Sequence, residues 1–214
     1  MRKFITFDII EFMKQLTIPS YTEKKIKKGQ FVLEKQDFPS LPFHDQAVEL
    51  ANTKGQFIGI GYLSEQNKGI GWFISHKKVT LDVSFFCQLF QCAKEKRQVY
   101  QQSEETTAYR LFNQEGDGFG GFTIDLYQDY AVFSWYNLFV YEMKETVVQA
   151  FQHVFPEVAG AYEKIRFKGL DVESAHLYGQ EASAFFTILE NGVLYQVFMN
   201  DGLMTGIFLD QHEV

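Results

Sequence analysis

The chain has 214 residues, 46% of them hydrophobic and 17% aromatic, and a formal net charge of -7. This composition excludes a disordered chain and allows one large or two small domains with their own cores. No apolar run approaches the ~20 residues that cross a bilayer, and Asp8 and Glu11 interrupt the apolar start that a signal peptide needs. Cys87 and Cys92 fall on different faces of one predicted helix, so we expect no disulfide, as is usual for a cytoplasmic protein. Because no apolar run is long enough to span a bilayer, we also expect no membrane partner.

The charge is unevenly distributed along the chain. Residues 1–100 carry 15 Lys and Arg against 10 Asp and Glu, a net +5, whereas residues 101–214 carry 5 against 17, a net -12. Either this is the ordinary variation of charge along an acidic protein, or only the first half binds a polyanion such as RNA. If RNA binds, we expect the acidic half not to contribute and two basic clusters to contact its phosphates: Lys24, Lys25, Lys27, Lys28, and then Lys94, Lys96 and Arg97.

Residues 1–78 are predicted to form a small β-barrel. Residues 1–12 show no clear period, so we expect a dispensable extension there. Short apolar runs at close spacing, separated by glycine-rich turns, are typical of a barrel. The predicted strands are 31–33, 47–50, 56–63 and 70–74.

Residues 79–198 are predicted to form a bridging helix and a central α+β domain. Asp82 is a suitable N-cap for a helix that runs to about Gln101. The later elements are a strand at 109–112, a hairpin at 122–136, a helix at 140–155, a strand at 159–167, a long loop at 167–182, and a hairpin at 185–198 around Asn191-Gly192.

Candidate active-site motifs are few. The run 116–121 contains G-x-G-x-x-G, but the alternating residues after it predict a strand where a dinucleotide site needs a helix. We therefore expect a tight glycine turn. The five histidines are scattered without metal-ligand spacing, and no nucleophile elbow or P-loop is present, so we expect no metal and no complete active site.

Four motifs together resemble one family. They are Tyr109-Arg110-Leu111, the run 115–121 (EGDGFGG), Ile124-Asp125, and the run 201–211 (DGLMTGIFLDQ). This combination is similar to the bacterial class I, S-adenosylmethionine-dependent ribosomal RNA large-subunit methyltransferases of the cytosine-C5 type with an N-terminal PUA domain. His212 departs from that pattern, because the family commonly has Arg there, and the H-P-W segment that many members carry near the start is absent.

The resemblance implies a PUA barrel, a central domain and then a Rossmann-like methyltransferase domain, whose first residues would be 199–214. It places Phe208, Asp210 and Gln211 beside the cofactor or substrate pocket, on a turn formed by Thr205-Gly206. The implied cofactor is S-adenosylmethionine and the implied partner is ribosomal RNA, with a homodimer as a further option. Because the family's catalytic cysteine and glycine-rich loop would lie beyond Val214, we expect an inactive fragment that does not bind the cofactor.

Two alternatives stay open. The chain could be a stand-alone, non-catalytic RNA-binding adaptor, or a protein-interaction domain without an RNA role. A catalytic domain encoded after residue 214 would favour the enzyme, and a stop codon would favour the adaptor.

Overall fold

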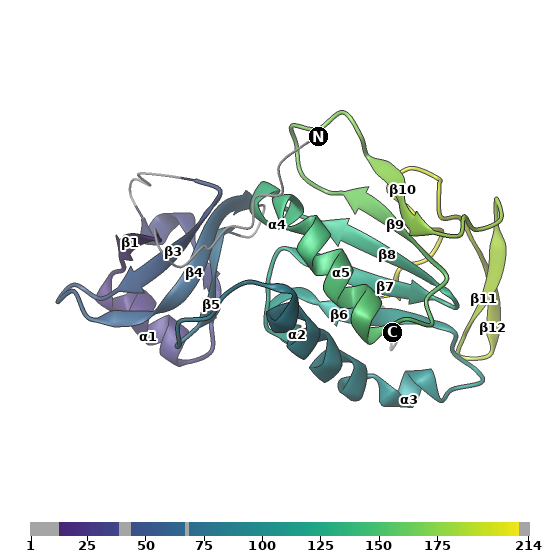
Figure 1. Ribbon diagram of the computed structural model, residues 1–214, viewed down its shortest axis with the longest axis horizontal. Helices are drawn as coiled ribbons and strands as arrows, with labels where there is room; N and C mark the ends of the chain where they lie inside the picture. Colours follow the sequence, from purple (N-terminus) through teal and green to yellow (C-terminus); the bar gives the residue numbers. More distant parts are fainter. Residues whose placement is uncertain (1–12, 39–43, 67–68, 210–214) are drawn as a thin grey trace. The chain divides into compact units, whose positions relative to one another are not determined.

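The computed structural model describes residues 13–38, 44–66 and 69–209. The chain divides into two compact units, Met1–Phe85 and Phe86–Val214, which we call the N-terminal and C-terminal units (Figure 1). The predicted domain boundaries after residues 78 and 198 stay predictions. The expected extension at residues 1–12 lies outside the described residues.

The N-terminal unit is built on a five-stranded mixed sheet with the order β1-β3-β4-β5-β2, in which β1 and β3 are parallel. All four strands predicted here are present. The elements are β1 (Lys14–Thr17), α1 (Ser20–Lys27), β2 (Val32–Leu33), the 3-10 turn η2 (Lys35–Asp37), β3 (Gln46–Ala51), β4 (Phe57–Gln66) and β5 (Gly69–Ser75).

The core of the N-terminal unit comes from side chains on one face of these strands. Val48 and Leu50 alternate along β3 and are fully buried, as the two-residue period of a strand requires. Ile26 of α1 joins the same cluster. The glycines of β4 and β5 allow close approach, because a Cβ at Gly71 would lie 2.2 Å from the backbone oxygen of Tyr62.

The C-terminal unit is an α+β structure around a five-stranded sheet with the order β10-β9-β8-β7-β6 and a separate two-stranded hairpin, β11-β12. Only the β8–β9 pair of the large sheet is parallel, and the helices α4 and α5 make that crossover. The elements are α2 (Val83–Lys96, which starts just before the unit), α3 (Gln98–Gln101), β6 (Ala108–Asn113), η3 (Gln114–Asp117), β7 (Phe122–Tyr127), β8 (Tyr130–Trp135), α4 (Leu138–Glu142), α5 (Lys144–Val154), β9 (Gly160–Ile165), β10 (Ser174–Gly179), β11 (Phe186–Glu190) and β12 (Val193–Val197).

Helices α2 and α5 cover one face of this sheet, which we call the helix face (Figure 1). Aromatic rings fill the space between them. Phe133 of β8 meets Phe151 of α5 edge-on at 5.1 Å between ring centroids, and Phe90 of α2 meets Phe122 of β7 at 6.2 Å. These rings are fully buried, so this face holds much of the unit's apolar core.

Two predicted turns are confirmed in detail. Asn191 and Gly192 both have positive φ (52° and 76°), as the tight turn of the β11-β12 hairpin requires. The glycine run 116–121 is followed by β7, so the predicted glycine turn is confirmed as well. Gly118 and Gly121 have φ of 97° and 102° there.

Three element predictions need correction. The bridging helix ends at Lys96, and a separate turn, α3, follows Arg97. The predicted helix 140–155 is two helices, α4 and α5, that meet at Met143. The predicted loop 167–182 contains the edge strand β10, whose residues are mostly half-exposed.

No helix in residues 13–38, 44–66 and 69–209 is long and apolar enough to cross a membrane.

Candidate functional site

The face of the large sheet opposite the helices, which we call the open face, carries a polar patch. Ser134 of β8 lies opposite Lys164 of β9, and Arg110 of β6 lies opposite Asp125 of β7. These four residues line one pocket of about 390 Å³, which includes volume open to solvent. The pocket's other side is formed by the segment after the hairpin, residues 203–209 except Gly206.

Lys164 is the most unusual side chain of this pocket, because it is fully buried. Its Nζ donates to the backbone oxygen of Met199 at 2.7 Å, to the backbone oxygen of Gly202 and to Ser174 Oγ at 3.0 Å. Burial disfavours its charged form, and this lowers the Lys164 pKa to about 8. Lys164 thus fixes the loop at residues 199–202 to β9.

Two further cations line the same pocket. Arg110 forms a two-point ion pair with Asp125, with Nε–Oδ1 and Nη2–Oδ2 distances of 2.8 and 3.1 Å. Arg166, which follows β9, is exposed and donates from Nη2 to the backbone oxygen of Leu203 at 2.6 Å. The pocket is therefore basic within a unit that is acidic as a whole.

The motif residues of the last segment lie at this pocket. Thr205 is buried, and its Oγ1 lies 2.8 Å from the Tyr127 hydroxyl. Burial raises the pKa of Tyr127, so that hydroxyl stays protonated. Phe208, a predicted cofactor-binding residue, lines the pocket and is 59% exposed. Asp210 and Gln211, predicted with it, lie outside the described residues.

The cluster Lys94, Lys96 and Arg97 contacts its own chain. Arg97 binds the buried Asp117 through both guanidinium ends at 2.7 and 2.6 Å, and Lys96 reaches the same carboxylate at 3.0 Å. Burial alone would raise the pKa of Asp117, but these hydrogen bonds, with that from the Asn113 amide, lower it. Lys94 contacts Glu157 at 3.0 Å.

The cluster on α1 is divided. Lys25 pairs with Glu34 at 2.7 Å, and Lys27 pairs with Glu23 at 2.6 Å. Lys24 and Lys28 are exposed and make no ion pair within the described part of the chain.

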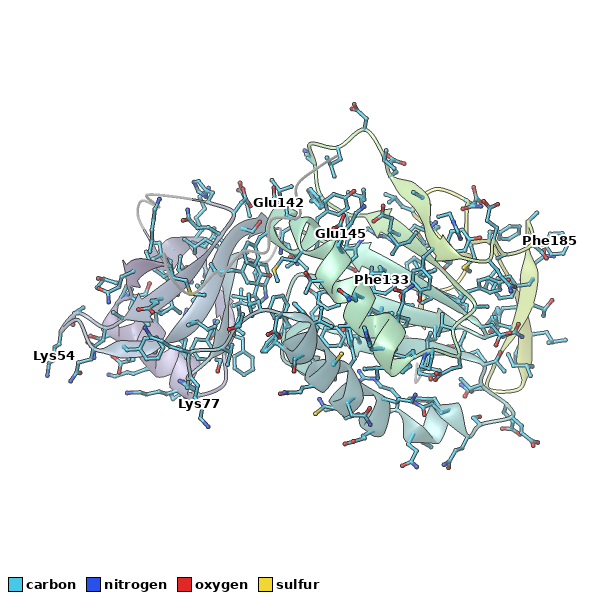
Figure 2. All side chains as sticks on the ribbon, viewed as in Figure 1. Lys54, Lys77, Phe133, Glu142, Glu145 and Phe185 are labelled. Atoms are coloured by element: carbon cyan, nitrogen blue, oxygen red, sulfur yellow. The ribbon has the colours of Figure 1, made fainter. Side chains whose placement is uncertain are left out.

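The structure also exposes cations that the sequence analysis did not single out. Lys54 and Lys77 extend from loops of the N-terminal unit (Figure 2). Lys164 and Arg166 were missed as well, because they lie far in the sequence from Arg110 and from the last segment, with which they line the pocket. Only the resemblance drew attention to Arg110.

Neither cysteine lies at the pocket. Cys87 Sγ contacts the backbone oxygen of Ala150 at 3.6 Å, and Cys92 is exposed on α2. Within the described ranges, no group of three or more His, Cys, Asp or Glu side chains is placed to hold a metal ion.

Comparison with known proteins identifies a PUA-like domain at residues 16–76. It overlaps the described strands and α1 of the N-terminal unit. The predicted fold class, a PUA-like unit followed by an α+β unit, is therefore confirmed.

The chain is similar to several methyltransferases over most of its length. A Bacillus subtilis protein provisionally named as a ribosomal RNA large subunit methyltransferase, YwbD, is 37% identical over 94% of this chain and 53% of its own. Ribosomal RNA large subunit methyltransferase I of Photobacterium profundum is 33% identical over 80% of this chain and 45% of its own. The chain spans about half the length of these relatives.

Two solved structures match with 55% identity over 94% of this chain and 52% of theirs. One is a provisionally assigned SAM-dependent methyltransferase from Streptococcus mutans, with a TM-score of 0.90. The other is a provisionally assigned methyltransferase complexed with S-adenosylhomocysteine (SAH), with a TM-score of 0.89. These matches cover nearly all of this chain and do not support the expectation of an inactive fragment.

Proposed function

We propose that this chain acts in the S-adenosylmethionine-dependent methylation of large-subunit ribosomal RNA, for which it binds and positions the RNA. The observation that carries the proposal is the 55% identity, over 94% of the chain, to a methyltransferase structure that contains SAH. The curated relatives named for ribosomal RNA supply the substrate class. The same names give no support to the non-catalytic adaptor.

The PUA-like unit is the proposed RNA-binding module. Lys24 and Lys28 are the members of the α1 cluster that can reach phosphates without first breaking an ion pair. Lys54 and Lys77 are further exposed cations of this unit (Figure 2). Contacts of this kind release counterions, so binding should weaken steeply as salt is added.

The cofactor would supply an electrophilic methyl group, and we place Phe208, Asp210 and Gln211 beside it or beside the target base. The exposed ring of Phe208 gives a flat apolar surface on which an aromatic ligand can stack. Within the described residues, Lys164 would keep this segment in place by holding the loop before it.

The proposed target atom is C5 of a cytosine, on the basis of the family resemblance. That chemistry uses a cysteine that adds to C6 and makes C5 nucleophilic. We assign this role to neither cysteine of the chain, because Cys87 contacts α5, Cys92 is exposed on α2, and neither lines the pocket.

Deletion of the gene that encodes this chain tests the proposal. Nucleoside mass spectrometry and bisulfite sequencing of large-subunit ribosomal RNA should show the loss of one 5-methylcytosine, and the intact gene should restore it. Loss of a different methylated nucleoside would retain the methyltransferase and refute the target atom. An unchanged methylation profile would refute the proposal.

A further inference from the structure

Two neighbouring cations at the end of β9, Lys164 and Arg166, form no ion pair among the described residues, although Asp201 acts on Lys164 from a longer distance and favours its charged form. Lys164 lies on β9 and Arg166 directly follows the strand, and both line the pocket of the open face. Their hydrogen-bond partners are neutral oxygens: Met199, Gly202 and Ser174 for Lys164, and Leu203 for Arg166.

Two neighbouring cations without an ion pair destabilise the folded state. A buried ammonium without a directly paired carboxylate loses hydration that hydrogen bonds replace only in part, and the nearby Arg166 repels it more than the distant Asp201 attracts it. Carboxylates are not scarce in this half of the chain, since residues 101–214 hold 17 acidic residues against 5 basic ones. Three of those five, Arg110, Lys164 and Arg166, nevertheless line the same pocket. Asp125 offsets Arg110, so the two cations of β9 leave the pocket with net positive charge.

The surroundings indicate which anion fits. The Ser134 side chain supplies a hydroxyl on the pocket floor, and Arg166 presents an exposed guanidinium. Phe208 and Met204, which are 59% and 43% exposed, add apolar surface beside these polar groups. A cationic pocket next to an exposed aromatic ring matches a nucleotide, whose phosphate meets the cations while its base or ribose contacts the ring.

We propose that this pocket binds a backbone phosphate of the RNA substrate, with Arg166 as the contacting residue and Lys164 as the fixed charge behind it. This inference rests on the proposed function and departs from the expectation that the acidic half takes no part in RNA binding. It places a second point of RNA contact in the C-terminal unit, in addition to the PUA-like unit.

The test compares Arg166→Gln with Lys168→Gln, a matched control. Lys168 is an exposed cation two residues further along that does not line the pocket. Affinity for a large-subunit ribosomal RNA fragment is measured by fluorescence anisotropy at several salt concentrations. Arg166→Gln should weaken binding about fivefold at low salt and reduce the slope of log K against log salt by about 0.7, the value for one contact on single-stranded RNA. Lys168→Gln should change neither value, and Arg166→Lys should retain most of the affinity.

The outcomes separate the two proposals. If Arg166→Gln binds RNA like Lys168→Gln while Lys24→Glu/Lys28→Glu weakens binding, the pocket is not a phosphate site and the proposed function stands. If the wild-type protein shows no salt-dependent RNA binding, both fail. If inorganic phosphate raises the melting temperature of the wild type but not of Arg166→Gln, and RNA affinity is unchanged, the pocket takes only small anions and the inference is overturned.

Discussion

The two faces of the large sheet are made by the same strands but differ in chemistry. Phe133 and Ser134 are neighbours on β8, as are Glu163 and Lys164 on β9, and each pair divides between the two faces. On the helix face, Glu163 is neutralised by Lys144 at 3.1 Å and also accepts a hydrogen bond from the Trp135 indole. On the open face, Lys164 donates only to neutral oxygens and forms no ion pair among the described residues.

This difference indicates how the C-terminal unit combines stability with a binding site. The helix face buries interlocked rings and a paired charge, which is how a sheet gains stability from packing. The open face pairs Arg110 with Asp125 but buries the ammonium of Lys164 without an ion pair, and buried charges with shifted pKa values are concentrated at functional sites. Three variants, ordered by their expected effect on the free energy of unfolding, test this division.

Phe133→Ala should have the largest effect. The ring is fully buried between β8 and α5, whereas Phe185, beside the β11-β12 hairpin, is 53% exposed (Figure 2). Truncation of a buried phenylalanine removes its contacts and leaves a cavity, so we expect a loss of about 3–5 kcal/mol. Phe185→Ala is the matched control and should cost less than about 1 kcal/mol. Urea denaturation of both variants measures the difference, and equal losses would contradict the assignment of the core to the helix face.

The hairpins and the glycine turn could be predicted from the sequence because each depends on residues that are close together in the chain. Asn191-Gly192 sets a turn by itself, and two-residue alternation assigns Phe122 and Ile124 to one face. Strand β10 was missed because it pairs only with β9 at the sheet's edge, so it needs no apolar alternation.

The pocket could not be predicted in the same way. Arg110, Lys164 and Arg166 meet only because β6, β7, β8 and β9 are adjacent in the sheet. A net charge of -12 for residues 101–214 also concealed a local basic site. Conversely, Arg97 stood out as a cation in a basic run, but Asp117, 20 positions later, engages its guanidinium.

The second variant, Lys164→Met, tests whether the buried charge of Lys164 destabilises the folded protein. The test is the pH dependence of the free energy of unfolding. The folded-state pKa of Lys164 is about 8, below the 10.5 of an ordinary lysine. Between these values the unfolded chain binds more protons than the folded one, so the contribution of Lys164 to stability rises with pH. Over this whole pH range, the unfolding free energy gained from the lowered pKa of Lys164 is at most about 3 kcal/mol.

The measurement is the difference in unfolding free energy between wild type and Lys164→Met from pH 7 to pH 10. The wild type should become more stable relative to Lys164→Met as the pH rises above about 8. Tyrosines titrate in both proteins, and their effect cancels in the difference. A difference that stays constant over this range would show that Lys164 keeps an ordinary pKa and that its burial carries no charge penalty.

The third variant, Phe208→Ala, should have the smallest effect on stability. Phe208 is 59% exposed, whereas the next residue, Leu209, is 5% exposed and packs in a buried apolar cluster that also contains Val132 and Met199. Loss of an exposed ring should change the free energy of unfolding by less than about 0.5 kcal/mol, whereas Leu209→Ala should cost about 2–3 kcal/mol. Thermal or urea denaturation of the two variants checks this contrast. If removal of the Phe208 ring leaves the fold unchanged in this way, a loss of RNA or cofactor binding by Phe208→Ala indicates that the ring contacts the ligand directly. A Phe208→Ala protein as destabilised as Leu209→Ala would instead place this ring in the core and remove it from the proposed site.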